Sequence, residues 1–184
     1  MKTFITMIML LVISVIPVSA EIFENPGMEV SIGRSGSFAP GADDPSHDFT
    51  WISLSLLNKF DINEKWNIDL LGTVGHLWWK SKEYNQYKKT YSIGSELILY
   101  RIISKRISVG LGGGFATLTE KKDLPELGNS GLYGTITGRV KVKIGNEEDY
   151  GLIVAADHIS DALQDGDDGD SGKNVLSLKF YFMF

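Results

Sequence analysis

Residues 174–184 read Asn-Val-Leu-Ser-Leu-Lys-Phe-Tyr-Phe-Met-Phe, and large apolar side chains occupy every second position of this stretch. Successive side chains of an extended strand point to opposite faces. One face carries Leu176, Leu178, Phe180, Phe182 and Phe184, and the other carries Ser177, Lys179, Tyr181 and Met183. The first face suits lipid and the second suits a polar lumen, which is typical of a strand in the wall of a transmembrane β-barrel.

Seven segments upstream show the same two-residue period. Each is close to or longer than the ~9–11 residues that a tilted strand needs to cross a membrane. The segments are residues 28–37, 49–60, 66–79, 90–101, 107–118, 132–144 and 150–160. Together with the last strand they give an even number, which permits closure. We therefore predict an all-β fold, an eight-stranded antiparallel transmembrane β-barrel of the outer membrane.

The connections between these segments alternate in length. The first, third, fifth and seventh span ten to thirteen residues, whereas the second, fourth and sixth span five. Outer-membrane barrels have short turns on the periplasmic side and long loops on the outside. We therefore expect both chain ends at the periplasmic rim, and we predict the outer membrane of a Gram-negative bacterium as the location.

The N-terminal stretch indicates export. Residues 1–20 contain one charge, Lys2, an apolar run from Phe4 to Ile16, and the small-residue end Val18-Ser19-Ala20. This is the pattern of a cleaved signal peptide, and the apolar run is too short for a spanning helix. We expect residues 21–184 to form a single β-barrel domain.

The composition excludes several classes of protein. Cysteine is absent, which excludes a disulfide framework, a thiolate metal site and a lipid-modified cysteine. The chain has 18 basic and 23 acidic residues and a net charge of −5, so a basic surface for nucleic acid has no support.

Three cations of the segment 132–144 lie on the face opposite its apolar residues: Arg139, Lys141 and Lys143. They are predicted to point into the barrel, where a charge without a counter-charge costs several kcal/mol. The candidate partners are Glu29, Asp69 and Glu96. Because eight strands enclose room only for side chains, we expect no open channel.

Aromatic residues gather near the segment ends, where outer-membrane barrels carry two girdles. The expected outer girdle is Phe49, Trp51, Trp78, Trp79 and Tyr91. The expected inner girdle is Phe60, Trp66, Tyr100, Phe182 and Phe184. The alternative is that aromatic residues are simply common in strands.

His158-Ile159-Ser160 is the candidate for chemistry. Residues two apart in a strand share a face, so the imidazole and the hydroxyl are expected to be neighbours, as a serine nucleophile with a histidine base requires. The phase of Leu152 and Val154 places the pair on the lipid-facing side near the outer end. The alternative is that His158 and Ser160 have no catalytic role and only form hydrogen bonds at the membrane interface. His76, which lies near the outer rim, is interpreted as interfacial packing.

The residues around His158 and Ser160 resemble part of a known protein family. The run His158-Ile-Ser-Asp-Ala-Leu163, Gly172, Asn174 and Ser177-Leu178 resembles the C-terminal region of the PagL family of outer-membrane lipid A 3-O-deacylases. The segments with looser similarity are Trp78-Trp79, residues 109–115, and Leu132-Tyr-Gly134 with Gly138. The likeness is specific over residues 156–184 and loose over the rest of the mature chain.

The resemblance implies an active site on the outer wall of the barrel, level with the outer leaflet. Ser160 would attack the ester at the 3-position of lipid A, His158 would be the general base, and Asn174 would orient the histidine. The residues near the oxyanion would be Asp161, Asp170 and Gly172. No soluble cofactor is implied. The implied partners are lipid A of lipopolysaccharide and, because the chain ends on Phe184, the barrel-assembly machinery.

Three residues depart from the family's pattern. Asn174 stands where the best-known member has Glu, and Asp161 and Asp170 stand where Asn is usual. An amide orients a ring but cannot stabilise an imidazolium as a carboxylate does, and an ionised carboxylate disfavours an oxyanion. Two alternatives therefore stay open: a non-catalytic small barrel whose outer loops bind partners, and a soluble periplasmic lipid-binding barrel.

The loop Asp165–Gly172 is acidic enough to raise the question of calcium. It lacks the Glu at the twelfth position of an EF-hand loop, where Leu176 falls. A solvated acidic loop is the favoured interpretation, and no metal site is predicted.

Overall fold

A computed structural model describes residues 25–35, 49–80, 87–119, 132–144, 149–161 and 172–184. The expected signal peptide and the long connections lie outside the described residues, apart from a few residues at the ends of the connections. Among the described residues, no helix has the length and apolar character needed to cross a membrane.

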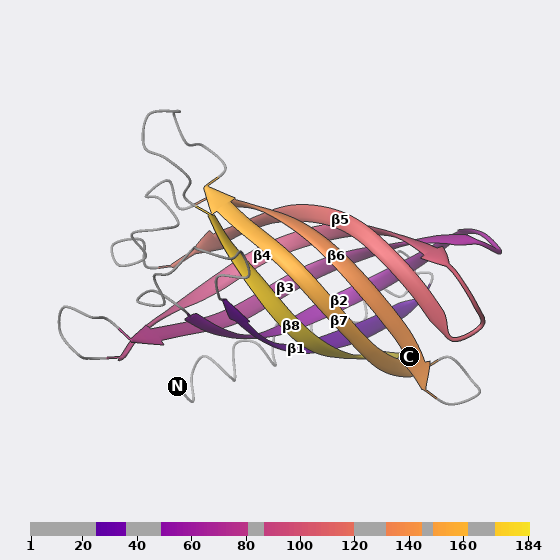
Figure 1. Cartoon of the computed structure of the whole chain (residues 1–184), viewed down its shortest axis with the longest axis horizontal. Coiled ribbons are helices and arrows are strands. Elements are labelled where there is room, and N and C mark those ends of the chain that lie inside the picture. Colours follow the sequence, from indigo (N-terminus) through magenta and orange to yellow (C-terminus); the bar gives the residue numbers. More distant parts are fainter. Residues whose placement is uncertain (1–24, 36–48, 81–86, 120–131, 145–148, 162–171) are drawn as a thin grey trace, which may run out of the picture.

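The described chain forms a closed antiparallel barrel in which each strand pairs with the next and β1 pairs with β8 (Figure 1). The strands are β1 (Pro26–Ser35), β2 (Phe49–Asn63), β3 (Trp66–Lys80), β4 (Tyr87–Ile102), β5 (Ile107–Leu118), β6 (Leu132–Ile144), β7 (Tyr150–Asp161) and β8 (Gly172–Met183). The eight-stranded fold is confirmed, and the bounds of β5 and β6 are those predicted. The starts of β2, β3 and β7 are also as predicted, and the remaining bounds differ by one to three residues.

The turn between β2 and β3 is shorter than predicted. Only Glu64 and Lys65 form it, because β2 continues to Asn63, which pairs with Trp66 after an irregularity next to Asp61. These polar residues interrupt the apolar alternation, but the backbone ladder does not depend on side-chain polarity. Strand pairing therefore extends beyond the apolar band that the sequence pattern reveals.

The outward face of the barrel is apolar. Its side chains are about half exposed, for example Val30 at 49%, Val154 at 51% and Leu178 at 50%. Water-soluble monomers rarely expose a continuous apolar surface of this kind. The wall therefore faces lipid, and the chain is an outer-membrane β-barrel.

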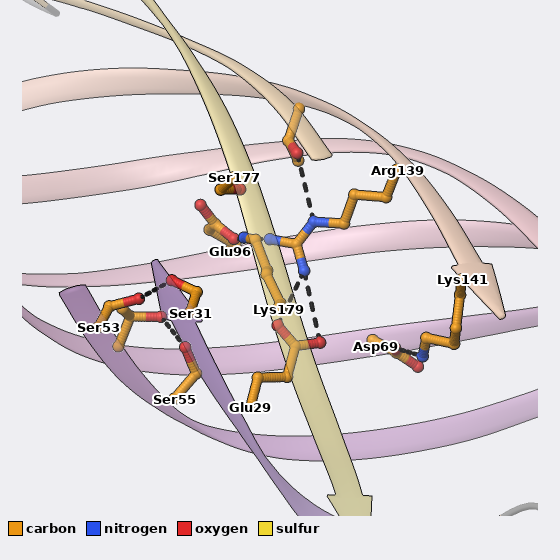
Figure 2. A network of polar contacts seen from close by, with 12 residues as sticks. Glu29, Ser31, Ser53, Ser55, Asp69, Glu96, Arg139, Lys141, Ser177 and Lys179 are labelled. Carbon is orange, nitrogen blue, oxygen red and sulfur yellow. Dashed lines mark hydrogen bonds and ion pairs between the residues drawn. The ribbon is translucent and has the colours of Figure 1, made fainter. Parts of the chain in front are cut away.

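The inside of the barrel holds paired charges (Figure 2). Arg139 Nη1 donates to Glu29 at 3.1 Å, and Nη2 of the same guanidinium pairs with Glu96. Lys141 pairs with Asp69. The three predicted partners are thus confirmed, while Lys143 lines a cavity of about 220 Å³ at the short-turn end of the barrel.

A second interior group joins β7 to β8. The Ser177 hydroxyl donates to Asp157 Oδ2 at 3.1 Å, and Lys179 Nζ lies 3.9 Å from the same oxygen. Asp157 is buried, at 4% exposure. These contacts fix the inner faces of the two strands that carry His158 and Asn174 on their outer faces.

The girdle prediction was wrong for several aromatic residues. Phe49, Trp51 and Trp79 are buried inside the long-connection end of the barrel, where they pack with Leu77 and Tyr133. Tyr100 is also fully buried. The reason is that side chains alternate between the two faces of a strand, so nearness to a strand end does not determine which face a residue occupies. Aromatic residues that do lie on the outward face include Trp78, Tyr91, Phe182 and Phe184.

The Arg139 pairs predict a large stability effect. Arg139→Leu leaves Glu29 and Glu96 buried without their cation, which should lower the free energy of unfolding by about 3–5 kcal/mol. Urea unfolding in detergent micelles measures this. As a control, Lys59→Ala removes a more exposed ion pair with Asp61 and should cost at most about 1 kcal/mol. Equal losses in the two variants would show that the interior pairs do not stabilise the barrel.

Candidate active site on the outer wall of β7 and β8

His158 and Ser160 lie on the outward face of β7. The residues that alternate with them, Asp157 and Ile159, are buried inside the barrel. His158 is exposed and Ser160 is partly exposed. The predicted position on the lipid-facing wall is therefore confirmed, and the pair lies near the end of β7 from which the long connection leaves.

Asn174 lies directly across from His158. The register of β7 and β8 pairs the two residues, and Asn174 Oδ1 lies 3.0 Å from His158 Nδ1. An amide oxygen can only accept, so Nδ1–H is the donor and Nε2 of the neutral ring carries no proton. The neighbouring strand thus sets the tautomer in which Nε2 can act as a base.

Gly172 makes room for the imidazole ring. A Cβ at this position would lie 2.6 Å from His158 Cε1 and 2.7 Å from Nε2, closer than real Cβ atoms approach. Any side chain at this position would therefore have to displace the ring. The edge of the ring that carries Nε2 thus lies over Gly172.

This position brings Nε2 to the level of Ser160. Gly172 pairs directly with Ser160, and paired residues of antiparallel strands have Cα atoms about 4.5–5.5 Å apart. Within the described parts of the chain, no hydrogen bond joins the Ser160 hydroxyl to His158. The Ser160 hydroxyl and His158 Nε2 share the outward face beside Gly172.

The predicted oxyanion residues are only partly described. Gly172 is placed as above. Asp161 ends β7 opposite Tyr133, and its side chain lies outside what the structure describes. Asp170 also lies outside the described residues, so both remain predictions. Asp157 adjoins His158 in the chain, but it faces the lumen and cannot serve as the acid partner.

His76 occupies a different part of the outer wall, on β3. Its ring centroid lies 4.8 Å from that of Tyr91 and 5.6 Å from that of Trp78. His76 thus packs against two aromatic rings, and its place at the membrane interface stays a prediction. Among the residues that the structure describes, no three His, Cys, Asp or Glu side chains form a group that could hold a metal ion. The acidic loop Asp165–Gly172 falls almost wholly outside those residues.

Gly134 is a residue near the site that the sequence analysis did not assign a role. It pairs with Ser160 from the β6 side, and a Cβ built there would meet no atom within 4 Å. The sequence shows a glycine there, but only the register of β6 and β7 shows that it adjoins the serine.

The tautomer of His158 is a direct test of this geometry. In the wild type, ¹⁵N NMR of the neutral ring should show the proton on Nδ1, because Asn174 accepts it. Asn174→Ala removes the acceptor and should give a mixture of tautomers, whereas Asn174→Asp should keep the proton on Nδ1. A predominantly Nε2-protonated ring in the wild type would contradict the hydrogen bond described here.

No protein-family model and no curated protein matches this sequence. Solved structures do match. The outer membrane enzyme PagL superposes with a TM-score of 0.54 at 16% identity, covering 85% of this chain and 98% of that one. The N-terminal β-barrel domain of Pseudomonas aeruginosa OprF has a TM-score of 0.52 at 9% identity, covering 88% and 98%. A de novo designed transmembrane β-barrel has a TM-score of 0.51 at 7% identity, covering 88% and 97%. At these identities the likeness shows the fold alone.

Proposed function

We propose that this barrel is a lipid A 3-O-deacylase, a serine esterase of the outer membrane. The observation that carries the proposal is the arrangement of His158: Asn174 fixes its Nδ1, and its Nε2 lies over Gly172 at the level of Ser160. This arrangement resembles the base and orienting group of a hydrolytic triad, with a serine on the same face.

The position of these residues supports a lipid as the substrate. Polar side chains on a lipid-facing wall are costly, which makes them candidates for a role in the membrane. A lipid ester in the adjacent leaflet would reach Ser160 without leaving the membrane. The resemblance of residues 156–184 to lipid A 3-O-deacylases supports the 3-position ester of lipid A within that class.

The reaction follows from the two side chains. Ser160 Oγ attacks the acyl carbonyl carbon while His158 Nε2 accepts the hydroxyl proton. The tetrahedral intermediate collapses, the C–O bond to the sugar breaks, and His158 returns the proton to the sugar oxygen. Water, deprotonated by the same histidine, then attacks the acyl-serine carbonyl, the acyl–Oγ bond breaks, and the histidine returns the proton to Ser160 Oγ. The products are a 3-hydroxy fatty acid and a lipid A that lacks one chain.

Asn174 performs part of the task of a carboxylate. In the triad template, replacing Asp by Asn lowers turnover by about 10⁴ because the wrong tautomer forms. Here the amide oxygen faces Nδ1, so the productive tautomer is kept. What an amide lacks is the negative charge that stabilises the imidazolium, which makes a slow enzyme the expectation.

Mass spectrometry of lipid A tests the proposal. Refolded protein in detergent should remove one 3-hydroxyacyl mass, and Ser160→Ala should reduce the rate by at least about 10³-fold. Ser95→Ala, which changes an exposed serine of β4, is the matched control and should leave the rate unchanged. A folded wild-type barrel that leaves several lipid A types intact would refute the activity.

Two observations favour the second candidate, a non-catalytic barrel whose outer loops bind partners. Asn174 provides no negative charge at the acid position, and within the described residues no Ser160–His158 hydrogen bond is formed. In that case the polar pair would only anchor the wall at the interface. A wild-type barrel that folds normally but does not cleave lipid A would support this candidate.

A further inference from the structure

The two flanks of Ser160 differ on the outer wall. β6, β7 and β8 lie side by side (Figure 1), and Ser160 pairs with Gly134 of β6 on one side and Gly172 of β8 on the other. Both neighbours are glycines, so neither contributes a side chain. What occupies the space above each glycine therefore decides from which side a substrate can reach the serine.

The β8 flank is filled. The imidazole of His158 lies over Gly172, with Cε1 and Nε2 at 2.6 and 2.7 Å from the position of a Cβ. Asn174, the next outward residue of β8, holds the ring in this place through Nδ1. A substrate carbonyl cannot occupy the same volume.

The β6 flank is open. A Cβ at Gly134 would meet no atom within 4 Å. Two exposed apolar side chains border this space: Ile136, two residues along β6 and 63% exposed, and Phe115, which pairs with Gly134 from β5 and is 60% exposed. Gly134 therefore leaves a gap between side chains on the outward face, next to Ser160 and near these two apolar residues.

We propose that Gly134 is the floor of the sub-site that receives the acyl group, an inference that rests on the proposed esterase function. The ester carbonyl approaches Ser160 from the β6 flank, opposite the imidazole. Its acyl chain then extends over Ile136 and Phe115 toward the membrane core, where apolar contact with the chain is favourable. Glycine is needed at position 134 because any side chain would occupy the place of the carbonyl.

Gly134→Leu tests this sub-site. The Cβ that the substitution adds meets no atom within 4 Å and points outward, so the barrel should fold, as judged by the mobility shift of folded barrels in gel electrophoresis. The expected loss in kcat/KM is roughly 10²-fold or more, because displacement of a reacting group by about 1 Å has that effect. The control is Gly72→Leu on β3, where a Cβ also meets no atom within 4 Å, and it should leave kcat/KM unchanged.

A second pair of variants tests the direction of the chain. Ile136→Ala on the β6 flank should raise KM and alter the preferred acyl length, whereas Leu176→Ala on the β8 flank should change neither. This pair of variants also tests the sub-site on the β6 flank if Gly134→Leu fails to fold.

The outcomes separate the two proposals. An inactive wild type would refute the esterase itself. An active wild type in which Gly134→Leu is equally active, or in which Leu176→Ala alters acyl preference and Ile136→Ala does not, would overturn the β6 sub-site and leave the esterase standing.

Discussion

Closure of the sheet leaves each strand residue only two directions, the lumen or the lipid, and this parity determines what each side chain can do. In β7, burial of Asp157 and Ile159 places His158 and Ser160 outside; in β8, burial of Val175 places Asn174 outside. A shift of one residue in either strand would move its polar groups to the opposite face. The candidate site therefore depends on the register of two strands.

The register is secured from the inside of the barrel. Arg139 links β6 to β1 and β4 through Glu29 and Glu96, and Asp157 links β7 to β8 through Ser177. Buried charges retain their pairing only when the strands align correctly, because an unpaired partner is costly. The same charged side chains occupy part of the lumen.

The sequence predicts much of this arrangement because parity is visible in it. The alternation of β8 and the cations of β6 identify the lumen face, and His158-Ile159-Ser160 is assigned to the correct wall. Cross-strand neighbours are not visible in one sequence. The contact of Gly172 with the imidazole and the open space at Gly134 follow from pairing between strands. Nearness to a strand end predicts the wrong face for Phe49, Trp51 and Trp79. Their positions in the two-residue alternation turn these side chains into the lumen.

The central claim is that Ser160 is a nucleophile activated by His158 on the outer wall. A long-chain alkyl fluorophosphonate, which phosphonylates activated serines, tests it most directly on the folded barrel in detergent. We expect one adduct, assigned to Ser160 by peptide mass spectrometry, and its loss in His158→Ala. A folded wild type that gains no adduct, or a His158→Ala variant that reacts equally well, would contradict it.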